Sequence, residues 1–83
     1  IVEIKINIIN FGFSPKEIHI SQVSRVTWTN KDSTSHTVTS DNNLFSSSLL
    51  GNESQFSRIF NEKGSFSYHC SPHPSMTGKI IVE

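Results

Sequence analysis

Apolar and polar residues alternate strictly at the beginning of this chain. The apolar side chains occupy every second position, namely Val2, Ile4, Ile6 and Ile8, and charged or amide side chains stand between them. A period of two is that of a β-strand with one buried face, so the pattern predicts a strand over residues 1–9. A helical fold is disfavoured, because the 83 residues include no alanine and a single methionine.

Shorter apolar runs with the same alternation recur along the chain. They predict strands at residues 18–20, 26–30, 36–40, 56–60, 66–70 and 80–82. Turn-forming residues separate them and interrupt the pattern at 11–15, 30–35 and 61–64. Residues 41–54 are polar and irregular, and we expect Leu44, Phe45, Leu49 and Leu50 to anchor them in the core. Short strands spaced by turns predict one all-β domain over residues 1–83, an antiparallel β-sandwich or barrel.

The composition excludes several classes of function. Seven Lys and Arg residues balance seven Asp and Glu residues, so the chain lacks the basic surface that binds nucleic acid. No apolar stretch is long enough to span a membrane. The single Cys cannot form an internal disulfide, and only 34% of the residues are hydrophobic. A core this small needs another source of stability, and a bound metal is one.

One segment concentrates the residues that bind soft metals. In Cys70-Ser-Pro-His73-Pro-Ser-Met76 a thiol, an imidazole and a thioether follow one another at equal spacing, and His36 lies upstream at the start of a predicted strand. A thiolate, two imidazoles and a weak axial thioether are the ligands of a blue copper electron-transfer site. Pro72 and Pro74 flank His73 and restrict the backbone, so the loop holds its shape without metal.

Other interpretations of these residues stay open at this point. Structural zinc is the competing metal, but it usually takes two or more thiolates and no thioether. A catalytic Cys–His pair would need an orienting residue and an oxyanion hole, and neither is identifiable. Taken singly, Cys70 or Met76 also fits a packed core position.

A copper site imposes a condition on the topology. His36 and the segment 70–76 must lie at the same end of the sandwich, yet strands that simply alternate in direction would place them at opposite ends. The two coincide only if residues 41–54 cross the sandwich as an additional irregular element. Fourteen extended residues span roughly 46 Å, which is enough for a small domain. The same parity places the turn at Phe11–Phe13 at the end of the sandwich that carries His36 and the segment 70–76, the ligand end.

The sequence then resembles a known family over nearly its whole length. The similarity lies in four segments, of which the last is the most specific: Phe13-Ser-Pro15, Val26-Thr-Trp28-Thr-Asn30-Lys-Asp32, His36-Thr-Val38 and Gly64–Val82. They resemble the cupredoxin family of type 1 blue copper proteins, in particular its small plastocyanin-like and amicyanin-like members. The short spacing of Cys70, His73 and Met76 is closer to the amicyanin pattern.

The resemblance implies a fold, a cofactor and a function. The implied fold is a Greek-key β-sandwich of about seven to eight strands. It implies a single type 1 copper bound by His36, Cys70, His73 and, axially, Met76. One-electron transfer between redox partners would follow, with the edge of His73 as the exit, so we expect a carrier rather than an enzyme. The alternative is a copper protein with an open axial site that reacts directly with a small molecule such as nitric oxide.

Three positions depart from the family pattern. Thr37 stands where many members carry an Asn that ties the two ligand loops together, and a Thr hydroxyl can serve part of that role. Val23 and Ser24 replace a common Gly-Asp turn. His69 precedes Cys70 where plastocyanins carry a Tyr; it would bind a second copper only with further imidazoles, of which His19 alone is unassigned, so we expect His69 to point outward.

The neutral charge also shapes the expected partners. Redox proteins would dock transiently near His73 through a small apolar ring, for which Phe11, Gly12, Pro72, Pro74 and Phe45 are the candidates. Neither nucleic acid nor a membrane span is expected, and we expect a monomer. Because copper is inserted outside the reducing cytosol, we expect an extracytoplasmic location, periplasmic or at the cell surface, with a signal or anchor removed before residue 1.

Overall fold

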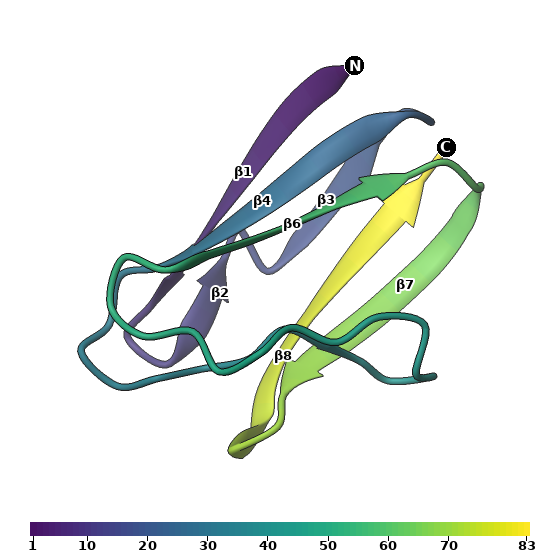
Figure 1. The fold of residues 1–83 in the computed structure, drawn as a ribbon. Helices are drawn as coiled ribbons and strands as arrows, with labels where there is room; N and C mark the ends of the chain where they lie inside the picture. The colour runs from purple at the N-terminus through teal and green to yellow at the C-terminus, as the bar shows by residue number, and fades with distance from the viewer.

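Two four-stranded sheets face one another in the computed structural model, which describes residues 1–83 (Figure 1). The first sheet has the order β2(Gly12–Ser14), β1(Val2–Ile9), β4(Ser24–Asn30), β6(Gln55–Phe60). The second has the order β3(Glu17–Ile20), β8(His73–Val82), β7(Gly64–Cys70), β5(Thr39–Ser40). The predicted β-sandwich is therefore confirmed, and no helix is present. The structure thus offers no helical segment that could cross a membrane.

The strand boundaries differ from the sequence prediction at three places. The residues around Phe13, predicted only to interrupt the pattern, form the short strand β2, which pairs with the end of β1. The strand predicted at 36–40 is reduced to β5 and an isolated bridge between His36 and Leu50. The last strand begins at His73 instead of near Ile80, because β7 and β8 continue to pair up to Cys70 and His73.

Pairing within the sheets is mixed, although the sequence predicted an antiparallel arrangement. β1 runs parallel to β4, and β3 runs parallel to β8, while the remaining pairs are antiparallel. Alternation along a strand shows which side chains face the core, but it carries no information about the direction of the neighbouring strand.

The core fills the space between the two sheets with aromatic rings. In β4 every second residue is buried, which brings Val26 and the fully buried Trp28 inward. The Trp28 ring lies 5.4 Å from that of Tyr68 and 5.7 Å from that of Phe56, measured between centroids. Phe60, also fully buried, adds to the same cluster. This packing fixes the distance between the sheets and so supports both ligand-bearing segments.

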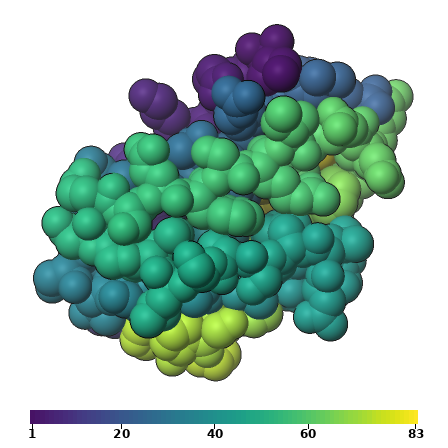
Figure 2. Space-filling view, viewed as in Figure 1, coloured from purple at the N-terminus to yellow at the C-terminus, as the bar shows by residue number.

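Residues 41–54 cross the sandwich as the topology required. Residues 36–40 run away from the ligand end, and the following segment returns beside them, with bridges between Thr39 and Ser46 and between His36 and Leu50. The segment ends where the N–H of Asn30 donates to the carbonyl of Ser54 at 3.0 Å. In Figure 2 it lies in teal and green across the front of the molecule. The topological prediction is confirmed.

The anchors of this crossing segment were only half predicted. Phe45 and Leu50 are buried at 8% and 4% exposure, but Leu44 and Leu49 are 53% and 62% exposed, so their assignment to the core was wrong. In an extended segment against one side of a sandwich, neighbouring residues point in opposite directions. One member of each apolar pair therefore faces solvent.

An arginine on β6 points into the sandwich. Phe56, Arg58 and Phe60 share the inner side of this strand, and the guanidinium of Arg58 lies 4.9 Å from the centre of the Phe45 ring and 4.8 Å from that of Phe60. Cation–π contacts of this kind partly offset the loss of water around the charge. Because β6 is the last strand of its sheet, the charge sits beside an open edge.

Candidate metal centre

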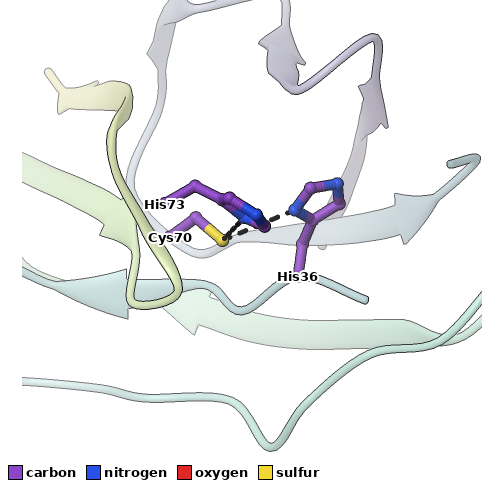
Figure 3. Close-up of side chains that lie close together, drawn as sticks. All are labelled: His36, Cys70 and His73. Carbon is purple, nitrogen blue, oxygen red and sulfur yellow. Dashed lines mark hydrogen bonds between the residues drawn. The ribbon is translucent and has the colours of Figure 1, made fainter. Parts of the chain in front are cut away.

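Three side chains from two distant segments of the chain converge at one end of the sandwich. One ligand atom each from His36, Cys70 and His73 lie within 4.8 Å of one another. The Cys70 Sγ is 3.5 Å from the Nδ1 of His36 and 3.5 Å from the Nδ1 of His73. Figure 3 shows both rings turned toward the sulfur. We call this end of the molecule the ligand end.

Each of these residues is held by backbone pairing, His36 through an isolated bridge and the other two at the end of the β7–β8 hairpin. His36 exchanges two backbone hydrogen bonds with Leu50, of 2.7 Å and 3.0 Å. Cys70 ends β7 and His73 begins β8, and the register between the strands shifts between His69 and Cys70. Such an irregularity re-aims side chains at the end of a hairpin. The β7–β8 hairpin therefore places Cys70 and His73, and the bridge to the crossing segment places His36.

The residues expected to bind the metal differ sharply in their exposure. Cys70 and His36 are fully buried, and Met76 on β8 is 4% exposed. His73 is only half-buried, so its imidazole forms the accessible edge of the group. Pro72 and Pro74 beside it are exposed. The sequence prediction that His73 faces the surface is consistent with this arrangement.

A carboxylate that the sequence prediction overlooked lies behind His36. The Nε2 of His36 is 2.9 Å from an Oδ of Asp32. Burial acts to raise the pKa of Asp32, but hydrogen bonds from the Phe11 N–H, from the His36 ring and from the Asn10 N–H lower this pKa below its ordinary value. An ionised carboxylate only accepts, so Nε2 carries the proton and the lone pair of Nδ1 faces Cys70.

The signal for Asp32 was present in the sequence. It precedes His36 by four residues, and imidazole ligands usually donate their second nitrogen to a carboxylate or carbonyl. The segment was assigned only as a turn because its composition is that of a turn. Nothing in a turn composition shows which side chain folds back onto the ligand.

Thr37 joins the two ligand segments. Its Oγ1 accepts a hydrogen bond of 2.8 Å from the N–H of Ser71, and its own N–H points to the Cys70 Sγ at 3.4 Å. The Thr37 hydroxyl also lies 2.9 Å from that of Thr39. The expectation that this hydroxyl ties the loops together is confirmed. Val23, at the second departure from the family pattern, has a positive φ of 62°, a conformation that a glycine adopts more readily than a β-branched residue.

Phe11 packs against both imidazoles. Its ring centre lies 5.1 Å from that of His36 and 5.0 Å from that of His73, in both cases edge to face. The turn it occupies is thus at the ligand end, as the strand parity predicted. Phe11 as a whole is 53% exposed. Phe45, the other aromatic candidate for the docking surface, is instead buried against Trp28. The assignment of Phe45 to the docking ring was wrong.

The remaining histidines lie apart from this group. The Nδ1 of His69 is 2.6 Å from an Oδ of Asp41, with the imidazole side chain 29% exposed. His19 contacts Glu83 at 2.9 Å and lies on β3, paired with Ile81. His69 alternates with the buried Tyr68 and Cys70, and so faces the outer side of β7 as expected.

The donor set fits copper better than the competing metals. A soft cysteine sulfur and two imidazoles meet at one point, and their other contacts leave the Nδ1 atoms and the sulfur facing one another. This combination suits copper in both oxidation states, whereas structural zinc sites usually close with additional thiolates. The sequence family decides the matter. Residues 1–83 match the family of copper binding proteins of the plastocyanin/azurin type.

The chain belongs to this family. It is 32% identical over 90 residues to amicyanin of Paracoccus denitrificans, an alignment that covers 96% of this chain and 65% of that protein. This chain therefore spans slightly less than two thirds of the length of that relative. Amicyanin-alpha of Methylorubrum extorquens is also 32% identical, over 95% of this chain and 71% of the relative.

Solved cupredoxin structures share the fold. The Cu(I) form of an amicyanin variant superposes with a TM-score of 0.93 at 30% identity, covering 98% of this chain and 82% of the other. A purple cupredoxin from Nitrosopumilus maritimus superposes with a TM-score of 0.90 at 33% identity, covering 96% of this chain and 99% of the other. The cupredoxin sandwich predicted from the sequence is confirmed, and copper is the cofactor of this family.

Proposed function

We propose that this cupredoxin is a one-electron carrier whose type 1 copper is held by His36, Cys70, His73 and, axially, Met76. Bound copper would supply the Cu(II)/Cu(I) couple. The protein contributes a preformed set of donors, because the two rings and the thiol already face one another. Donors that keep their positions when the charge changes make the transfer of an electron easier.

The difference in exposure among the donors carries this proposal. Cys70 and His36 are fully buried and Met76 nearly so, which leaves the half-buried His73 as the contact with the outside. An electron would pass through the edge of this imidazole. Exposed Phe11, Pro72 and Pro74 surround it and would form the apolar ring on which a redox partner docks.

The same burial disfavours the alternative function. A copper protein that reacts with nitric oxide at an open axial position needs a path for the molecule to the metal. Met76 is 4% exposed and Phe11 packs over both imidazoles, which supports a closed site. Addition of nitric oxide should therefore leave the visible spectrum of the oxidised protein unchanged over minutes.

A titration with Cu(II) tests the assignment directly. One equivalent should produce an intense thiolate-to-copper band at roughly 600 nm. The variant Cys70→Ser should lose the band, while His69→Asn, a histidine outside the donor group, should keep it. An absent band in the wild-type protein, or a band that survives in Cys70→Ser, would contradict the proposal.

The partners and location follow as parts of the same proposal. The protein would act as a monomeric, single-domain carrier outside the cytoplasm, where copper is available. Because seven basic residues balance seven acidic ones, docking with a redox partner should be only weakly steered by charge. Stopped-flow rates of electron transfer should change less than about threefold between low and high salt. A steep salt dependence would point to a charged docking surface instead.

A further inference from the structure

The turn that carries Phe11 has an unfavourable backbone. Asn10 and Phe11 connect β1 to β2, and both have left-handed conformations, with φ of 52° and 56°. Tight hairpins of two residues require positive φ at both positions, which Gly, Asn and Asp accept more readily than other residues. Phe11 is a bulky residue in a conformation that its side chain disfavours. Something outside the hairpin must hold it there.

The carboxylate of Asp32 contacts both residues of this turn. Its Oδ1 accepts a hydrogen bond of 2.8 Å from the N–H of Asn10, and its Oδ2 accepts one of 3.0 Å from the N–H of Phe11. Consecutive N–H groups of a left-handed turn form a concave donor pair, and an anion satisfies both at once. Asp32 belongs to a different loop, so these bonds join two loops of the ligand end.

The same carboxylate contacts the ligand His36. The Nε2–H of His36 donates to Oδ2 at 2.9 Å, the oxygen that also accepts from Phe11. The side chain of Asp32 is only 13% exposed, so little water competes for it. Three donors from two segments thus converge on one anion. The ring of Phe11, held by this arrangement, lies edge-on against His36 and His73.

Asp32 itself is fixed by its surroundings. Its N–H donates to the Oδ1 of Asn30 at 2.9 Å, and its carbonyl accepts from the side chain of Asn52 at 3.1 Å. The amide of the fully buried Asn30 in turn donates to the carbonyls of Thr34 and Leu50. The carboxylate therefore sits on a rigid support and cannot easily follow a displaced turn.

We propose that Asp32 is the positioning residue of the ligand end, which with one carboxylate both orients His36 for the metal and holds Phe11 as a cap over the two imidazoles. The proposal rests on the proposed role of His36 as a ligand. It makes the turn at Phe11 and the metal centre a single unit. Because coupling between two sites is reciprocal, metal bound at His36 must also protect the turn at Asn10 and Phe11.

Asp32→Asn tests the proposal without changing the size of the side chain. An amide offers one oxygen in place of two and presents its own N–H groups, so it cannot satisfy three donors. In the metal-free protein, NMR hydrogen exchange of the Asn10 and Phe11 amides should accelerate at least about tenfold, because both lose their acceptor. The ¹⁵N shifts of His36 should change from one tautomer to a mixture of two. Affinity for copper should fall by about 10- to 100-fold, which is typical for loss of such a partner.

Asp41→Asn is the matched control. Asp41 also pairs with a histidine, His69, but contacts neither the turn nor a ligand. In the Asp41→Asn variant, the hydrogen-exchange rates of the Asn10 and Phe11 amides and the affinity for copper should match those of the wild type. Unchanged exchange of these two amides in Asp32→Asn would overturn the proposal. If wild-type protein binds no copper, the proposed function fails, but the exchange measurement still decides the role of Asp32 in the turn.

A second variant serves if Asp32→Asn does not fold. Phe11→Gly removes the ring and accepts positive φ without strain. With the carboxylate bonds left intact, the Asn10 amide should stay protected, and the solvent exposure of the His36 and His73 rings should rise. Binding of Cu(I) to the wild-type protein should also slow exchange of the Asn10 and Phe11 amides. The absence of that protection by Cu(I) in a protein that binds copper would overturn the proposed coupling.

Discussion

The ligand end and the aromatic interior of this protein are held together by different forces. At the ligand end, polar groups such as Asp32, Thr37 and Asn30 join loops through directed hydrogen bonds. In the interior, rings pack around Trp28, and its indole Nε1 and the Tyr68 hydroxyl have no partner within hydrogen-bonding geometry. At the ligand end, the direction of hydrogen bonds fixes where side chains lie, whereas in the interior the volumes of the packed rings do so.

This difference determines how each region should respond to change. A directed network fixes the orientation of a ring or a thiol, which a metal site needs. A packed interior tolerates little change in volume but supplies most of the free energy of folding. Mutations at the ligand end should therefore affect metal binding first, and mutations in the interior should affect stability first.

Removal of the central thiol should have the largest effect on binding. In Cys70→Ser the soft donor is lost, and a hydroxyl does not replace a thiolate for copper. We expect the intense visible band to disappear and copper affinity to fall by several orders of magnitude. The free energy of unfolding of the metal-free protein, measured with urea, should change by less than about 1.5 kcal/mol, because a hydroxyl of similar size can accept the hydrogen bond that the Thr37 N–H donates to the sulfur. A large loss of stability without metal would show that Cys70 acts mainly in packing.

Gly78→Ala should have the largest effect on the interior. A Cβ at Gly78 would overlap the phenol ring of Tyr68, which is fully buried against Trp28. Because neither ring can move without disturbing the cluster, we expect a loss of about 3 kcal/mol of unfolding free energy, measured with urea. Gly51→Ala is the control, since nothing lies within 4 Å of a Cβ there. A loss of similar size in Gly51→Ala would contradict the packing explanation.

Tyr68 provides a measure of how dry the interior is. Burial raises its pKa to about 12, against a smaller lowering contribution from the neighbouring Trp28 indole. It is the only tyrosine, so absorbance of tyrosinate near 295 nm reports this one residue. The titration midpoint in the folded protein should lie well above 10.

The same shift predicts the stability at high pH. Below pH 10 the phenol is protonated in both the folded and the unfolded protein, so the folded protein keeps the full contribution of the neutral Tyr68 to its free energy of unfolding. Between pH 10 and 12 the unfolded chain loses its proton first, so stability should fall by about 3 kcal/mol in total. Tyr68→Phe should lack this loss, and an equal loss in that variant would assign it to other groups.

Thr37→Val should have the smallest of these effects. The substitution keeps the shape of the side chain but leaves the N–H of Ser71 without its acceptor. We expect a loss of about 1 kcal/mol of unfolding free energy and a small shift in the visible band. Thr27→Val, which removes an exposed hydroxyl bond to Ser57, should cost less and leave the band unchanged. Equal shifts of the band in both variants would remove the special role of Thr37.

The sequence was most informative where residues are both regular and chemically distinctive. Alternation in β1, β4 and β7 predicted which side chains face the core, and Cys70, His73 and Met76 predicted the kind of metal site. The crossing of residues 41–54 followed from the need to place His36 and Cys70 at one end. These inferences use local pattern or simple geometry, both of which are present in a linear sequence.

The parts that sequence could not predict depend on contacts between segments. Leu44 and Leu49 look like core residues, but in an irregular segment there is no period to show which side faces the protein. The parallel direction of β1 and β4 is set by the connection between them and leaves no mark on either strand. The spacing of Asp32 and His36 was a local signal, but the contacts of Asp32 with Asn10 and Phe11 join residues more than twenty positions apart and leave no mark in the sequence.

The inward position of Arg58 has a consequence for self-association. β6 is the terminal strand of its sheet, and such a strand offers unpaired backbone groups to a second molecule. A strand added from another chain would have to continue the inner face of the sandwich, where it would meet the guanidinium of Arg58 above the rings of Phe45 and Phe60. The half-buried charge would therefore disfavour the pairing of a second chain with this edge strand.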